Sequence, residues 1–162
     1  MKWVTRSRPR VDRIACPWLI ARFIDPAAEF LYVPAAEVLH VATEIGATPY
    51  DIPGVEYGHV GELCSFDAFL RLHNLTDPAL QQLAVIVRGA DTARLDLAPQ
   101  CAGLLAQSLG LSALFADDHL MLRHGMVMYD AYYAWLKQAC GETHAGPPAA
   151  ARTPPYPPGV VD

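Results

Sequence analysis

The alternation of hydrophobic and polar positions divides the chain into a mixed first third and a helical remainder. Apolar and polar residues alternate over Lys2–Arg8, which predicts a short strand that ends before Pro9. The run Glu29–Val33, closed by Pro34, predicts a second strand, and Ala47–Ile52 predicts a third. Segments with helical periodicity separate these strands, so we expect a small sheet with helices packed against it.

Two helices are predicted between the strands. The first holds Pro17 in its first turn, where the missing N–H costs nothing, and should stop near Asp25. The second is expected over Ala35–Ile45, because Gly46 is a typical residue to end a helix. Each helix would carry the chain from one strand to the next.

From Cys64 onward the periodicity is helical throughout. The first expected helix begins at Cys64 or Ser65, and the second begins at Pro78 behind the N-cap Asp77. Three more are expected: from Pro99 to Gly110, from Asp117 to Gly125 and from Met126 to Leu136. The predicted fold class is therefore α+β, a small N-terminal sheet with helices followed by a mainly helical bundle.

Composition adds boundaries to this fold. A chain of 162 residues with 52% hydrophobic residues can bury a core, and we expect a single domain over residues 1–140. Prolines and glycines crowd residues 141–162, which predicts a flexible tail. No apolar run approaches the roughly 20 residues of a membrane span, and arginines replace the apolar segment of a signal peptide. We therefore expect a cytoplasmic protein.

The net charge of −5 is unevenly distributed, because half of the basic residues lie before position 23. The overall negative charge argues against binding of this chain alone to nucleic acid. A small oxyanion would suit a few arginines better, since guanidinium groups bind such anions with two parallel hydrogen bonds.

The stretch Glu56–Asp67 concentrates an imidazole, a thiol and carboxylates. Gly58 and Gly61 allow the backbone to bend around His59, which would lie just ahead of a helix N-terminus. Such a position favours metal or anion chemistry. The alternative is that these are ordinary polar residues of a surface turn.

Further candidate ligands lie in separate segments. Asp91 ends an apolar helix, where a carboxylate opposes the helix dipole and needs a partner such as Arg88 or a metal. His119 starts a later helix and Asp130 lies within the last one. Imidazoles and carboxylates together suit zinc, manganese, iron or nickel. No spacing rule joins these segments, and capping or core roles would explain the same residues.

The four cysteines form no CxxC pair, so neither a zinc ribbon nor a disulfide framework is indicated. Cys16 would lie beside a helix N-terminus and among arginines, an environment that lowers a thiol pKa. Cys16 and Cys64 are therefore candidate catalytic thiols. A buried and inert cysteine beside Trp18 is the alternative for Cys16.

Between Lys2 and Cys140 the sequence resembles the chromate resistance family, the C-terminal domain of ChrB-type proteins. The motifs that carry the resemblance are Lys2–Arg6, Asp12–Ile20, Cys64–Asp67, Ile86–Asp91 and Tyr129–Tyr133. It implies a link to chromate tolerance, a stress response in which some members act as chromate-sensing regulators. It also implies that His59, Cys64, Asp67, Asp91 and Asp130 match family motifs.

These observations lead to one hypothesis and two alternatives. The hypothesis is a metal-binding chromate resistance domain that senses or handles chromate or a related oxyanion. In it, a divalent transition metal is held by His59, Asp91, His119 and Asp130, and the anion is attracted by Arg6, Arg13 and Arg88. The first alternative is an enzyme, either a redox metalloenzyme of the superoxide dismutase or chromate reductase type or a thiol-dependent enzyme. The second is an interaction module for a chromate-responsive regulator or transporter, and self-association is compatible with all three.

Overall fold

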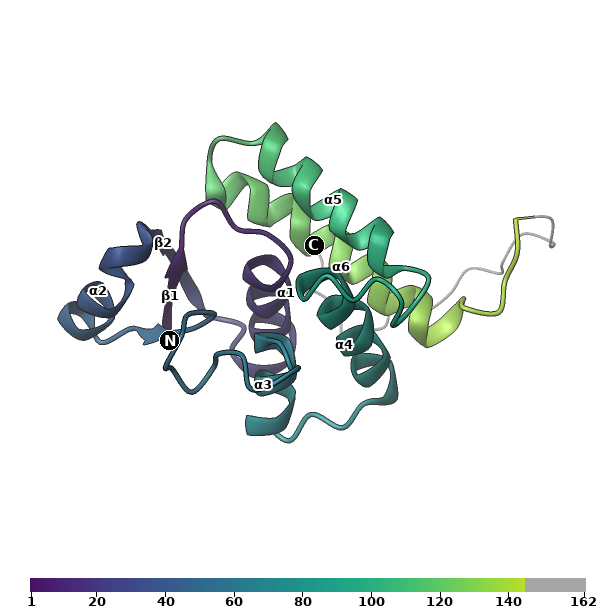
Figure 1. Ribbon diagram of the computed structural model, residues 1–162, viewed down its shortest axis with the longest axis horizontal. Coiled ribbons are helices and arrows are strands. Elements are labelled where there is room, and N and C mark those ends of the chain that lie inside the picture. Colours follow the sequence, from purple (N-terminus) through teal and green to yellow (C-terminus); the bar gives the residue numbers. More distant parts are fainter. Residues whose placement is uncertain (145–162) are drawn as a thin grey trace.

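A small parallel sheet forms the N-terminal part of the computed structural model, which describes residues 1–144. The strands β1 (Lys2–Arg6), β2 (Glu29–Val33) and β3 (Thr48–Pro49) lie in the order β2-β1-β3 (Figure 1). In the register, Val4 of β1 lies opposite residue 31 of β2 and residue 49 of β3. The predicted tail over residues 141–162 falls mainly outside the described part of the chain.

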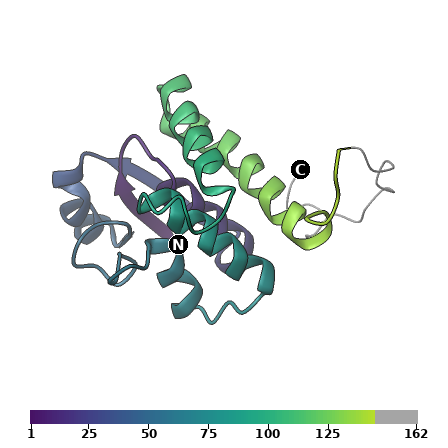
Figure 2. The same cartoon turned by 45° about the vertical axis from the view of Figure 1, so that its right-hand side comes forward.

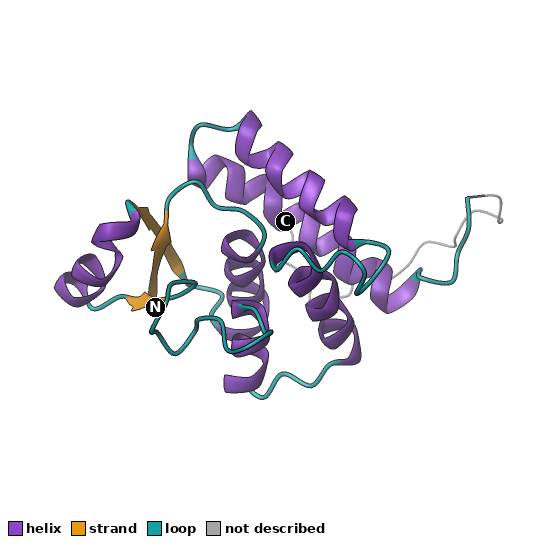
Figure 3. Ribbon diagram, viewed as in Figure 1, coloured by secondary structure: helices purple, strands orange, loops and turns teal. Residues whose placement is uncertain are grey.

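Helices cover both faces of the sheet (Figure 3). On one face lies α1 (Asp12–Leu19), which continues as the π-helix η1 (Ile20–Ile24). On the other lies α2 (Val38–Ile45), which follows the short 3-10 helix η2 (Ala35–Glu37). Side chains of successive strand residues point to opposite faces, so Trp3 joins the core around α1 while its neighbour in β1 joins the core around α2.

Four further helices build the bundle, and α6 also packs against α1 (Figure 2). They are α3 (Ser65–Leu72), α4 (Pro78–Asp91), α5 (Cys101–Leu114) and α6 (Asp118–Gln138). The predicted starts at Ser65 and Pro78 are confirmed, as is the α+β fold class. Among the described residues, no helix combines the length and apolar character needed to cross a bilayer.

Pro17 was predicted in the first turn of its helix, but it lies inside α1. A proline at this position offers no N–H to the carbonyl of Arg13, four residues earlier. The hydroxyl of Tyr32 donates to that carbonyl oxygen over 3.2 Å. A side chain from the neighbouring strand therefore replaces the missing backbone hydrogen bond.

Two glycines that were predicted to end helices lie within them. The helix α5 passes through Gly110, because a single glycine in a helix costs only about 1 kcal/mol relative to alanine. The helix α6 is continuous through Gly125, where an added Cβ would lie 2.3 Å from Cγ2 of Ile14. Gly125 thus allows α6 to approach α1 closely.

Candidate metal centre

The site lies where parallel sheets usually bind ligands. The chain passes from β1 to β2 on one side and returns to β3 on the other, so the direction of winding reverses between β1 and β3. Ligands in such folds bind beyond the carboxyl ends of the strands at this point. Here Arg6 ends β1, Asp12 begins α1 and Asp51 follows β3.

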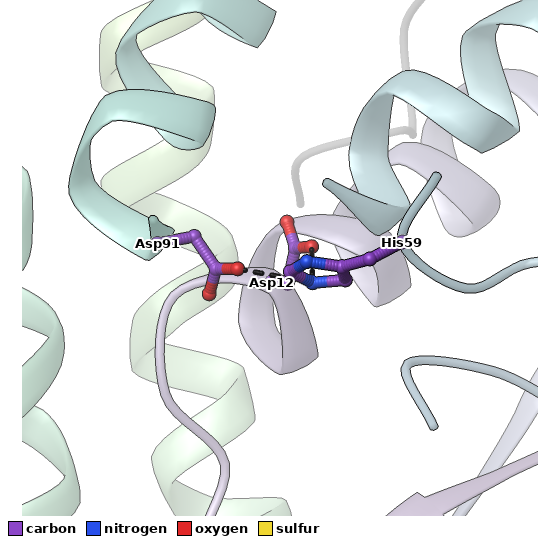
Figure 4. Close-up of side chains that lie close together, drawn as sticks. All are labelled: Asp12, His59 and Asp91. Carbon is purple, nitrogen blue, oxygen red and sulfur yellow. Dashed lines mark ion pairs between the residues drawn. The ribbon is translucent and has the colours of Figure 1, made fainter. Parts of the chain in front are cut away.

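His59 stands at the centre of this site, on the loop that leads to α3. Its Nε2 atom lies 3.5 Å from Oδ2 of Asp12, 3.3 Å from Oδ1 of Asp51 and 3.2 Å from Oδ2 of Asp91. Figure 4 shows the imidazole beside Asp12, with Asp91 reaching the same point from the end of α4. The Asp12 side chain is fully buried, whereas that of His59 is 42% exposed. One partly accessible imidazole therefore meets three carboxylates.

Backbone and hydroxyl donors hold the carboxylates in place. The N–H of Ser65 donates to Oδ2 of Asp12 over 2.6 Å. The hydroxyl group of Ser65 donates to Oδ1 of Asp51 over 3.1 Å. The N–H of Asp12 donates in turn to Asp91. Ser65 and Asp12 are the first residues of α3 and α1, so the positive ends of two helices face the carboxylates.

The backbone is strained beside the same residues. Val11, immediately before Asp12, has φ 30° and ψ −94°, and Asp51 has φ 52°. Positive φ is rare outside glycine and is a clear outlier for a β-branched residue such as valine. Strain of this kind costs of order 1–3 kcal/mol and tends to be retained at functional sites. Its position next to two of the carboxylates favours a functional role for the cluster.

The cluster holds protons more tightly than isolated side chains do. Hydrogen bonds with Asp12 and Asp51 raise the pKa of His59 to about 10. Burial, followed by the charges of Asp12 and Asp51, raises the pKa of Asp91 to about 7. Burial also raises the pKa of Asp12, whose Oδ1 atom is buried without a hydrogen-bond donor. Within the site two arginines pair with Asp51, so Asp12 and Asp91 share the single imidazole of His59.

A cation would find its ligands already assembled. One ligand atom each from Asp12, His59 and Asp91 lie within 4.8 Å of one another. An imidazole nitrogen with carboxylate oxygens suits a divalent transition metal such as manganese, iron or zinc. The buried Oδ1 of Asp12 has no hydrogen-bond donor, and a bound ion would supply the missing partner. The residues present therefore fit a divalent metal ion.

The structure brings together only part of the predicted ligand set. His59 and Asp91 meet, but His119 packs against the ring of Tyr32, with ring centroids 5.5 Å apart. Asp130 instead accepts from Nε1 of Trp18 over 2.7 Å and from two nitrogens of Arg22. Asp130 is thus engaged in a separate buried ion pair.

Asp12, a candidate ligand, and Asp51, which contacts His59, were missed in the sequence analysis. Both follow the carboxyl end of a strand, and this position was the signal in the sequence. A strand–helix–strand series implies parallel strands, whose carboxyl ends meet at one edge of the sheet.

The three predicted anion-binding arginines all contact carboxylates. Oδ2 of Asp51 lies 2.9 Å from Nη2 of Arg6 and 3.2 Å from Nε of Arg13. Burial opposes ionisation of Asp51, but His59 and these arginines hold its pKa below the usual range. Nη1 of Arg13 also donates to the carbonyl of residue 7 over 3.0 Å. Arg88 instead pairs with Oδ1 of residue 67 at 3.5 Å.

A pocket of about 410 Å³ opens beside the cluster. It is lined by Arg6, Asp51, Ile52–Gly54 and His59. Arg6 is therefore the one of the three predicted arginines that lines this pocket.

The expected low pKa of Cys16 is wrong. Its side chain is completely buried, and burial followed by the charge of Asp12 raises its thiol pKa well above the usual value. Cys64 is buried as well, with Sγ 3.4 Å from Oδ2 of Asp67, and burial raises its pKa too. Desolvation and neighbouring carboxylates favour the neutral thiol at both positions, and Cys16 lies inside α1 instead of at its N-terminus.

The fold and the site together define the class of protein. It is an α+β domain with a candidate metal centre, formed by a histidine among aspartates beyond the ends of the strands. The family model for the ChrB C-terminal domain matches residues 3–136. Protein ChrB of Cupriavidus metallidurans is 31% identical over 133 residues, which cover 82% of this chain and 40% of that protein. No solved structure matches. The chain belongs to the ChrB C-terminal domain family, a chromate resistance family, which confirms the resemblance seen in its motifs.

Proposed function

We propose that this domain binds a divalent transition metal through Asp12, His59 and Asp91, and that it uses the metal to sense or handle chromate or a related oxyanion. The observation that carries the proposal is the set of three ligand atoms within 4.8 Å of one another. One of these ligands, Asp12, is fully buried and has a carboxylate oxygen without a donor.

Charge balance supports a cation at this point. Arg6 and Arg13 both contact Asp51 and so neutralise that carboxylate. Asp12 and Asp91 are then left with the His59 imidazolium, and the pKa of Asp91 is raised to about 7. A divalent ion would replace the protons of His59 and Asp91 and balance the remaining charge.

The role of Asp51 in this proposal is to position the imidazole. It lies 3.3 Å from Nε2 of His59 and is fixed by Ser65 as well as by the arginines. Groups that hold a metal ligand in this way typically change metal affinity by about 10–100-fold when they are lost.

The pocket beside His59 supports an oxyanion as the second partner. A guanidinium group at Arg6 and a cation at the cluster would both attract an anion into the volume of about 410 Å³. Membership of a chromate resistance family points to chromate or an anion of similar shape. All three arginines pair with carboxylates, but Arg13 and Arg88 are less suited because neither lines this pocket.

A redox metalloenzyme would use the same centre, and turnover of chromate by the metal-loaded protein would distinguish it from a binding domain. A thiol enzyme lacks this support, since Cys16 and Cys64 are both fully buried.

The test of the metal proposal is elemental analysis and calorimetric titration with manganese, zinc and iron(II). We expect stoichiometric metal in the wild-type chain and at least about 100-fold weaker binding in His59→Gln, by analogy with the loss of a direct ligand. His119→Gln is the matched control, because it removes an imidazole outside the cluster, and it should bind as wild type does. A wild-type chain that binds none of these ions would refute the proposal.

The test of the anion proposal uses the metal-loaded protein titrated with chromate. Arg6→Gln should weaken chromate binding about tenfold, in line with one charge-assisted contact, and leave metal content unchanged. Arg94→Gln is the control, since Arg94 pairs with Asp96 away from the pocket and is exposed. Equal chromate affinity in the two variants would argue against the pocket while leaving the metal centre intact.

A further inference from the structure

The outer side of α5 is unusual for a surface helix. None of the residues Cys101–Leu114 is charged, and among its exposed positions only Gln107 has a polar side chain. A helix at the surface of a domain normally turns charged and polar residues to solvent, whereas one that is apolar all round is covered. We propose that the outer face of the α5–α6 hairpin is an interface between two copies of this chain.

A groove between the two helices forms one half of this face. It has a volume of about 460 Å³ and is lined by Gln100, Gln107, Val127, Met128, Ala131, Tyr132 and Trp135. The hydroxyl of Tyr132 already donates to Oε1 of Gln107 over 3.1 Å. The hydroxyl of Tyr132 and the amide oxygen of Gln107 therefore satisfy each other, which lowers the cost of excluding water from the groove.

Large exposed side chains form the other half. Leu114 is 74% exposed and Val127 is 64% exposed. Leu114 lies two turns beyond Gln107, so both residues are on the same side of α5. Gln107 also lines the groove, so the groove and Leu114 share one side of α5, which runs alongside α6 (Figure 1).

A second copy fits this face better than a charged partner does. The chain has a net charge of −5, so two copies repel unless they meet through an uncharged surface, and α5 provides one. A two-fold axis near the middle of the face would place Leu114 of each copy in the groove of the other, which is the self-complementarity of an isologous dimer. An acidic or basic partner would find no opposite charge on α5, and on α6 the face borders on the exposed Arg123, one turn before Val127.

The size of the face sets the strength of the contact. A helix of 14 residues is about 21 Å long, and two adjacent helices present a width of about 20 Å. The footprint is then roughly 400 Å² per copy, below the roughly 800 Å² per partner of a stable complex. The inferred dimer is therefore weak and reversible.

Sedimentation equilibrium of the full chain between about 1 μM and 1 mM tests this inference. We expect a concentration-dependent dimer, and Val127→Glu and Leu114→Glu should each raise its Kd about 100-fold, as charges placed in an interface core do. Val60→Glu is the matched control, because Val60 is also exposed, at 58%, but lies on the loop that carries His59. This variant should associate as wild type does.

Cross-linking tests the geometry separately. In a Cys140→Ser background the three remaining cysteines are buried. Gly110, whose surroundings are open, lies between Gln107 and Leu114, so Gly110→Cys should form a disulfide between copies under mild oxidation. Glu44→Cys, exposed on α2, should not. A chain that is monomeric at about 1 mM, or equal cross-linking at both positions, would overturn the inference and leave the groove to residues 145–162 or to another protein.

Discussion

Two buried carboxylate sites in this domain differ in how their charge is balanced. At Asp130, the carboxylate accepts from the Trp18 indole and from two nitrogens of Arg22, so one negative charge meets one positive charge and its oxygens have donors. At the candidate metal centre, Asp12 and Asp91 share a single imidazole and one oxygen of Asp12 has no donor. Burial is similar at the two sites, but neutralisation is not.

The comparison shows what distinguishes a structural carboxylate from a candidate ligand. A carboxylate with its own guanidinium stabilises packing and has no capacity left for an ion. At Asp91, burial followed by the charges of neighbouring carboxylates raises the pKa, and such a group gains stability when a cation enters. The two sites should therefore respond in opposite ways to substitution.

The largest change in the free energy of unfolding is expected at Asp130, which is paired with Arg22. Asp130→Ala should lower the free energy of unfolding by about 3–5 kcal/mol, because it breaks a buried ion pair and leaves the Trp18 N–H without its acceptor. Urea unfolding at pH 7 measures this loss. Metal content should be unchanged, and a variant that loses metal but keeps its stability would reverse our assignment of the two sites.

Asp12→Asn should show the opposite pattern. Metal affinity should fall about 100-fold, which corresponds to about 2.7 kcal/mol, because a charged ligand is lost. The metal-free protein should lose less than about 1 kcal/mol, since one of the competing carboxylates is removed while an amide oxygen can still accept from Ser65. Calorimetric titration and urea unfolding of the same sample separate the two quantities. A metal-free variant that is strongly destabilised would indicate that Asp12 is structural.

Metal binding should depend on pH in a way that only the unbalanced site predicts. A metal must displace the proton of His59, whose pKa is raised to about 10, so affinity should rise about tenfold per pH unit between pH 7 and 10. Below pH 7 the dependence should steepen, because Asp91 is then protonated as well. Titrations in several buffers measure the slope. A flat profile would show that neither group is a ligand.

The last effect concerns how the stability of the metal-free chain depends on pH. The pKa of Asp91 is raised in the folded state, so its protonated form contributes stability that is present below about pH 4 and lost as pH rises through about 7. A shift of about three pKa units corresponds to an upper limit of about 4 kcal/mol, and this contribution should disappear in Asp91→Asn. Unfolding curves between these pH values, with Asp96→Asn as an exposed control, would detect it. An identical pH profile in wild type and Asp91→Asn would remove Asp91 from the account.

The sequence predicted local structure better than contacts between residues that are far apart in the chain. Turn and capping residues such as Asp77 and Gly46 act within a few residues, so the helix boundaries beside them were correct. Gly125 was wrongly predicted to end a helix. A glycine is needed there because α6 contacts α1 closely, and this contact cannot be seen in the local sequence. His59 and Asp91 were identified by residue type and position, whereas no local rule could separate them from Asp130.

The centre also joins parts of the chain that lie far apart in the sequence. Asp12 begins α1, His59 lies on a loop after the sheet and Asp91 ends α4, so an ion held by them ties the sheet layer to the helical bundle. In terms of native-state hydrogen exchange, opening either part would require releasing the ion. Amides of β1 and α4 should then slow together on metal addition, and the two layers would open as one cooperative unit.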